Sequence, residues 1–166
     1  MAQERRSGCP INLTLEQLGD RWSLIVIRDV MFGNRRSYGD LLSGNLEGIA
    51  SNILADRLKR LAASGLLTRV SDPRHRQKHI YSLTEAGIQL VPVLAQMAAW
   101  GLAHTNPTAV LSARAKLLVD GGPEVWKALM DELRHLHLGA PKPQRSVLDD
   151  ARAAFAAAQA LEAPAS

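Results

Sequence analysis

The segment SNILADRLK, from Ser51 to Lys59, carries side chains whose chemistry matches the base edges of double-stranded DNA. An Asn side chain can pair bidentately with adenine, a Ser hydroxyl suits several bases, and an Ala methyl contacts the methyl group of thymine. Lys can reach guanine or a phosphate. On a helix, steps of 100° per residue place Asn52, Ala55 and Lys59 on one side, with Ser51 beside them. These four residues are therefore candidate DNA-reading residues.

A second group of candidates is cationic. The segment 69–79 contains four basic residues and a single acidic one, Asp72. A local basic feature of this kind is what binding to a polyanion requires, although a solvated turn is the competing interpretation. We expect the basic side chains of this segment to reach DNA phosphates or an adjacent minor groove. We also expect two loop arginines upstream of the segment to contact phosphates of the DNA backbone. The candidates are Arg74, Arg76, Lys78, Arg35 and Arg36.

Cys9, the single cysteine of the chain, precedes Pro10 and follows Arg5 and Arg6. An exposed thiol at a helix N-terminus beside positive charge reacts with oxidants or electrophiles, so Cys9 is a candidate redox-sensing residue. If two copies meet near this residue, an intersubunit disulfide can form. The alternative interpretation is an ordinary half-buried thiol.

The elements that must position these residues can be read from apolar spacing and capping residues. Asp20 caps an apolar helix through WSLIVIRDVMF that Gly33-Asn34 ends, and Ser37 caps a short helix to Leu42. The segment 50–64 repeats apolar residues at helical spacing, with Arg57 toward the buried side, where we expect an acidic partner. Residues 66–70 and 79–83 predict two antiparallel strands around a turn at 72–77.

A long helix is predicted from Glu85 to about Ala103, with a bend at Pro92. Its apolar residues cover more than one face, which one small domain cannot bury, so we infer a homodimer. Three further helices are predicted at 108–119, 123–138 and 146–161. The fold class is therefore mainly α with a small antiparallel β-hairpin: a winged helix-turn-helix domain at 9–104 and a helical C-terminal extension at 107–163.

Composition limits the alternatives. The chain has 166 residues, of which 46% are hydrophobic, 22% charged and 4% aromatic, an ordinary globular balance that favours a helical interior. All of its net charge of +4 lies before residue 107, where 13 Lys and Arg face 9 Asp and Glu; after it the numbers are 7 and 7. One cysteine excludes an intramolecular disulfide and a cysteine-built zinc site. We expect no cofactor, metal site, secretory signal or membrane segment, and a cytoplasmic location.

An enzyme is not expected, because the sequence has no Gly-rich phosphate loop, GxSxG, HExxH or close carboxylate pair. A winged helix used for protein interaction is a second alternative, which a neutral or acidic wing would have favoured. A third is a regulator switched by a small-molecule effector bound near Trp22 or the extension instead of by thiol chemistry.

Three runs together resemble the HxlR family of bacterial winged-helix transcription regulators, from about Cys9 to Gly101. They are CPINLTLEQLGDRWSLIVIRDVMFGNRRSYGDLL, GIASNILADRLKRLAASGLLTR and YSLTEAGIQLVPVL. The resemblance implies a dimer that binds an inverted-repeat operator in double-stranded DNA. Its recognition helix would be 50–64 and its wing 69–79, and it implies, as in some such regulators, thiol sensing at Cys9.

Two parts of the chain depart from the family pattern. The wing turn DPRHRQKHIYSLTEAG is more similar to the wings of MarR-type regulators than to the Pro-Pro-rich wing usual in the HxlR family, so individual wing contacts do not carry over. The tail from Pro107 onward is an addition that the resemblance does not cover.

Overall fold

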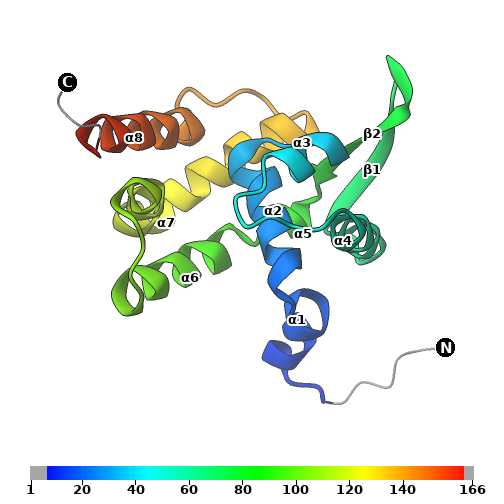
Figure 1. Cartoon of the computed structure of the whole chain (residues 1–166), viewed down its shortest axis with the longest axis horizontal. Coiled ribbons are helices and arrows are strands. Elements are labelled where there is room, and N and C mark those ends of the chain that lie inside the picture. Colours follow the sequence, from blue (N-terminus) through cyan, green and yellow to red (C-terminus); the bar gives the residue numbers. More distant parts are fainter. Residues whose placement is uncertain (1–6, 163–166) are drawn as a thin grey trace. The chain divides into compact units, whose positions relative to one another are not determined.

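The protein was analysed as a computed structural model that describes residues 7–162, except for the side chain of Arg76. The chain forms two compact units that divide between Gly87 and Ile88 (Figure 1). The first unit contains α1 (Pro10–Leu18), α2 (Arg21–Gly33), α3 (Tyr38–Ser43), α4 (Ser51–Ala63), β1 (Leu67–Asp72) and β2 (His75–Leu83). The short α5 (Glu85–Ile88) lies at the division, and α6 (Val91–His104), α7 (Ala109–Leu138) and α8 (Val147–Glu162) follow. The predicted fold class is confirmed.

The helix α2 forms the centre of the first unit. The carboxylate of Asp20 accepts hydrogen bonds from the backbone N–H groups of Trp22 and Ser23, both at 3.0 Å, which confirms the predicted N-cap. Asn34 ends the helix in the left-handed conformation, with φ of 47°. Between these ends Ile27 and Val30 are fully buried, as expected for a helix that is apolar around most of its circumference.

The helix α4 packs against α2 through one face. Leu54, Leu58 and Leu61 on this face are each no more than 1% exposed, which confirms the predicted 3.6-residue spacing. Burying a leucine side chain contributes about 1.5–3 kcal/mol. The opposite face of α4 is consequently left to solvent.

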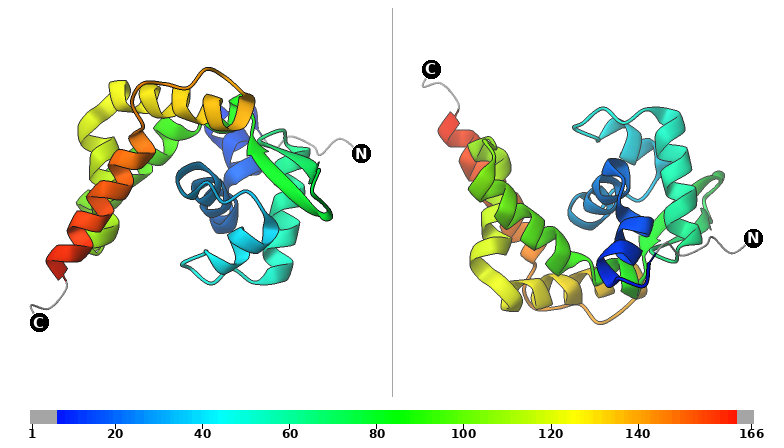
Figure 2. Two further views of the ribbon diagram at one scale, coloured as in Figure 1. Left: turned by 90° about the horizontal axis from the view of Figure 1, so that it is seen from above. Right: turned by 90° about the horizontal axis from the view of Figure 1, so that it is seen from below.

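The strands β1 and β2 pair antiparallel, with Arg69 opposite Tyr81 and Val70 opposite Ile80. Both strands are longer than predicted, because pairing continues past a bulge between Ser71 and Asp72 and leaves only a tight turn at residues 73–74. The Asp72 carboxylate accepts a 2.9 Å hydrogen bond from the backbone N–H of Arg74 in this turn. The hairpin thus extends beyond the helices of its unit (Figure 2).

The second unit is helical. The predicted helix from 85 to 103 is interrupted at residues 89–90, and Pro92 lies in the first turn of α6, where its missing N–H is tolerated. The helix α7 is kinked at Gly122, with φ of 56° and ψ of −152°, so the two predicted helices on either side of Gly121-Gly122-Pro123 are present. Both α6 and α8 pack against α7. In the structure α6 is thus grouped with the C-terminal helices, and the domain division expected at 104–107 stays a prediction.

The segment Glu85–His104 would also pass as a membrane span by length and composition, with a mean hydropathy of 1.4 over its most apolar stretch. A turn at residues 89–90 separates α5 from α6 within this segment. Only 22% of that stretch is buried in the structure. The unusual property of α6 is therefore apolar surface that its own unit leaves uncovered.

Candidate nucleic-acid interface

The outer face of α4 presents the predicted base-reading residues to solvent. Ser51, Asn52, Ala55 and Lys59 are all exposed, whereas the leucines behind them are buried. The helix also packs against β1, so this face and the hairpin belong to one unit (Figure 1). Small and hydrogen-bonding side chains here allow a second surface to approach the helix closely.

Arg57 anchors α4 to the N-terminus of α2, as the sequence analysis expected of it. Its side chain is 16% exposed, and its guanidinium group lies 2.9 Å from both the Asp20 and the Asp56 carboxylates. Burial by itself would raise the pKa of Asp20, but hydrogen bonds from Ser23 and the charge of Arg57 outweigh it, so the pKa is lowered. Arg57 is therefore a structural residue and does not face a DNA groove.

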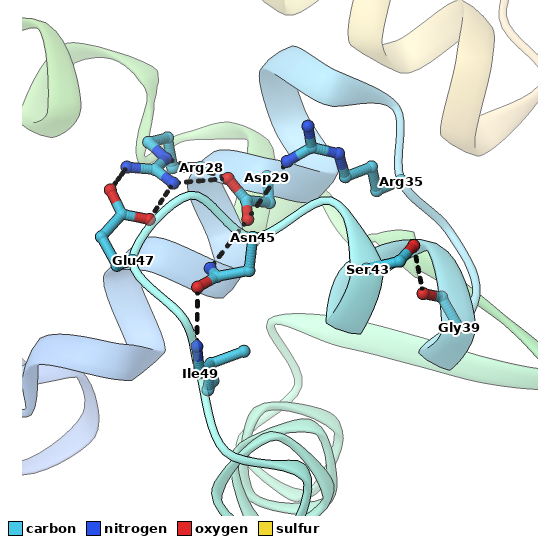
Figure 3. Close-up of polar contacts among 8 residues, drawn as sticks. All are labelled: Arg28, Asp29, Arg35, Gly39, Ser43, Asn45, Glu47 and Ile49. Atoms are coloured by element: carbon cyan, nitrogen blue, oxygen red, sulfur yellow. Dashed lines mark hydrogen bonds and ion pairs between the residues drawn. The ribbon is translucent and has the colours of Figure 1, made fainter.

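A polar network holds the loop that leads into α4 (Figure 3). The carboxylate of Asp29, only 5% exposed, accepts hydrogen bonds from Arg28 at 3.0 and 2.7 Å and from the Asn45 amide at 3.2 Å. Arg28 also binds both oxygens of Glu47, at 2.6 and 2.8 Å. The Asn45 side-chain oxygen accepts the backbone N–H of Ile49 at 2.9 Å. The residues immediately before α4 are thus fixed from α2.

The charges in this network stabilise one another. The hydrogen bonds from Arg28 lower the pKa of Glu47, and the hydrogen bonds to Glu47 raise the pKa of Arg28. The sequence analysis did not identify this network. Its one signal was an Arg-Asp pair inside an otherwise apolar helix, because a buried Asp needs partners.

Arg35 and Arg36, expected to touch DNA phosphates, have partners within the protein. Arg35 lies 3.4 Å from the Asp29 carboxylate. Arg36 donates to the backbone oxygen of Tyr81 at 3.2 Å and to the hydroxyl of Ser82, and its burial lowers the pKa of the guanidinium group. Both arginines therefore tie the α2–α3 loop to its surroundings, and a phosphate contact by either stays a prediction.

The hairpin exposes positive charge along its strands and at its turn. Arg69, Arg74 and Lys78 are exposed, while the side chain of Arg76 lies outside the described part of the structure. The neighbouring Val70 is 60% exposed, so the surface around these cations is accessible. The position of Arg74 and Lys78 agrees with a role in contacting phosphates.

Cys9 is exposed at the N-terminus of α1. Its backbone N–H donates to the Ser7 hydroxyl at 3.1 Å, and its carbonyl accepts from Leu13 at 2.9 Å. Arg5 and Arg6, which contributed to the expectation of thiol reactivity, lie outside the described residues. The thiol is accessible to a soluble reagent.

Comparison with known proteins places this geometry in a family. Residues 17–109 match the family described as HxlR-like helix-turn-helix. The chain belongs to this family. Among its relatives, YybR of Bacillus subtilis, an uncharacterized HTH-type transcriptional regulator, is 31% identical over 69% of this chain and 88% of its own. Rv3095 of Mycobacterium tuberculosis, with the same description, is 38% identical over 58% of this chain, and the match spans 60% of that relative's length.

Solved structures of similar proteins support the family assignment. The reduced form of the transcriptional regulator YodB from B. subtilis is 29% identical, with a TM-score of 0.50, and the match covers 61% of this chain and 99% of YodB. The crystal structure of PA1607 is 31% identical, with a TM-score of 0.56, and the match covers 63% of this chain and 70% of that one. For an HxlR-like protein, α3 and α4 are the helix-turn-helix and the hairpin is the wing.

Proposed function

We propose that this HxlR-like protein is a cytoplasmic transcription regulator that binds an inverted-repeat operator as a homodimer. The observation that supports this best is the exposed face of α4, with Ser51, Asn52, Ala55 and Lys59, in one unit with a hairpin that carries exposed Arg74 and Lys78. In this proposal α4 enters the major groove and reads bases, while the wing contacts phosphates. The description of the relatives Rv3095 and YybR as HTH-type transcriptional regulators agrees with it.

The dimer is proposed from the uncovered face of α6. Val93, Met97 and Trp100 are 41%, 50% and 64% exposed, and with Pro92 and Gln96 they form a shallow, largely apolar surface. Apolar residues at this spacing form one continuous stripe along the helix. A second copy that places the same stripe against it removes this surface from water on both protomers.

Selection of bound fragments from a random DNA pool tests the operator, and light scattering on the same sample tests the dimer. Two copies of α4 in successive major grooves require half-sites about 34–36 Å apart, so the selected sequences should contain an inverted repeat. A monomer in solution, or selection of unrelated sequences, would reject this part of the proposal.

The interaction-module alternative predicts a different behaviour on heparin resin. A protein that binds DNA through a cationic wing should be retained to high salt, since heparin is a polyanion. Elution at low salt would favour the alternative.

For the input signal we propose oxidation of Cys9. The thiol is exposed, and YodB, a relative of similar fold, was solved in a form described as reduced. Since the chain has one cysteine, a disulfide between Cys9 residues must link two copies, and it requires Cα atoms within about 7 Å of each other. Such a bond would alter the spacing of the two α4 helices.

Operator binding before and after diamide treatment tests this input, with Cys9→Ser as the control. We expect a cross-linked dimer on a non-reducing gel and altered affinity for the native chain alone. Unchanged affinity and no cross-link would reject the thiol switch and direct the search to an effector near Trp22 or the extension.

A further inference from the structure

Two hydrogen bonds join the first residue of α3 to the first residue of α4. The Tyr38 hydroxyl donates to the backbone oxygen of Ser51 at 3.0 Å and lies 2.6 Å from the Ser51 hydroxyl oxygen. The Tyr38 side chain is half-buried, whereas Ser51 is exposed on the outer face of α4. A residue of the first helix of the helix-turn-helix is therefore bonded directly to a candidate base-reading residue of the second.

Counting protons decides the direction of these bonds. A tyrosine hydroxyl carries one proton, and a backbone carbonyl carries none. When both contacts are hydrogen bonds, the tyrosine proton goes to the Ser51 carbonyl, which cannot donate, and the 2.6 Å contact between the two hydroxyls uses the proton of Ser51. The Ser51 hydroxyl then donates to Tyr38 and has only lone pairs to offer to the solvent side.

We propose that Tyr38 is a specificity-determining residue that makes Ser51 an obligate hydrogen-bond acceptor toward DNA. In the major groove, adenine and cytosine present amino groups that donate, whereas guanine and thymine present acceptors at the corresponding edge. Phosphate oxygens are also acceptors. Ser51 therefore selects an amino-bearing base, A or C, and does not bond to a phosphate. This inference rests on the proposed DNA-binding function.

The test is base selection from a random DNA pool by the native chain and by Tyr38→Phe, which removes one hydroxyl and retains the ring. The position read by Ser51 is identified as the one whose preference disappears in Ser51→Ala. We expect the native chain to prefer A or C there by roughly tenfold, the effect of leaving one buried polar group unpaired. In Tyr38→Phe the freed hydroxyl can also donate, so the preference should fall to about twofold or less, with affinity for random DNA unchanged.

Ser43→Ala is the matched control. Its hydroxyl also lies on α3, but it donates to the backbone oxygen of Gly39 within the same helix, at 2.9 Å (Figure 3). The control should select the same bases as the native chain, and thermal unfolding should show that all variants are folded. In Tyr38→Phe combined with Ser51→Ala, the second change should remove only the residual preference of about twofold or less, because both act on one contact.

The outcomes separate this inference from the function on which it rests. Specific selection by the native chain together with an unchanged preference in Tyr38→Phe would overturn the role of Tyr38 alone. A preference for G or T at the Ser51 position, or an equal loss of affinity for operator and random DNA, would also overturn it, and the equal loss would assign Tyr38 a phosphate contact. A native chain that selects no sequence would overturn the proposed function itself.

Discussion

The α4 helix and the wing belong to one unit but are held in opposite ways. The start of α4 is fixed by Asn45 and Tyr38, and its middle by Arg57. The turn of the wing, in contrast, is held by a bond within the turn itself, the hydrogen bond from the backbone N–H of Arg74 to the Asp72 carboxylate. Reading a base edge requires a side chain at a defined position, whereas attraction to phosphates depends only weakly on geometry. From this difference we propose that sequence discrimination resides in α4 and general affinity in the wing.

The largest expected effect is that of salt on the whole interface. If the dimer makes about 6–10 phosphate contacts, its affinity should fall by about 10³–10⁵-fold between 50 and 200 mM salt. Fluorescence anisotropy with a labelled operator over a salt series measures this slope. Affinity that is independent of salt would contradict phosphate contacts by the wing. It would also contradict the proposed difference between α4 and the wing.

Removal of the Asp29 carboxylate tests whether the support of α4 is needed. Asp29→Ala removes a carboxylate that is 5% exposed and leaves Arg28 with Glu47 as its remaining partner in this network, so we expect a loss of about 1–3 kcal/mol in the free energy of unfolding. Urea unfolding measures it. Asp131→Ala, which removes a carboxylate that is 40% exposed on α7, should cost no more than about 1 kcal/mol. Equal losses in the two variants would show that the network does not support α4.

Asn52→Ala tests base reading by α4. We expect a loss of roughly 1–3 kcal/mol per half-site on the operator and little change on random DNA, because a bidentate contact with adenine is removed. Alanine favours a helix more than asparagine does, so unfolding should not contribute. Competition between operator and random DNA gives the measurement, and an equal loss on both would contradict the assignment.

Arg76→Ala and Lys78→Ala test the wing. Each should weaken binding to all sequences alike and lower the slope of log affinity against log salt by about 1, since one phosphate contact is lost. The same salt series measures the effect. A change in the selected sequence would show that the wing reads bases. That outcome would contradict the proposal that α4 discriminates between sequences while the wing supplies general affinity.

The smallest effect concerns pH. Because the pKa of Glu47 is lowered in the folded protein by its hydrogen bonds to Arg28, the ionised carboxylate stabilises the fold above the ordinary value of 4.5. This stability should be lost as the pH falls from about 4.5 through the lowered pKa. Glu47→Gln should reduce the acid-dependent decrease of the thermal midpoint, and an identical pH profile for this variant would contradict the contribution of Glu47.

The sequence predicted the features that depend on local periodicity. The exposed face of α4 and the inward position of Arg57 follow from helical spacing, and the caps at Asp20 and Ser37 follow from residue type. The sequence did not predict the network around Asp29, because its partners come from a loop 16 to 19 residues away. From this loop Asn45 bonds to the Asp29 carboxylate, and Glu47 accepts hydrogen bonds from Arg28. The chain reverses direction at α3, which brings the following loop back to α2. No pattern among neighbouring residues of the sequence predicts this reversal. The same reason applies to Arg36, whose bonds cross to β2.

The segment 36–38 is bonded on both sides. The Arg36 carbonyl accepts the backbone N–H of Tyr81 at 2.7 Å, and Ser37 pairs with Ile80, so this segment is joined to β2 by an isolated β-bridge. The next residue, Tyr38, is bonded to the start of α4. A displacement of the wing relative to α4 would therefore stretch either the bonds of Arg36 and Ser37 to β2 or the bond of Tyr38 to Ser51. We therefore expect a movement of the wing at Ile80 and Tyr81 in a DNA complex to reach the first turn of α4 through residues 36–38.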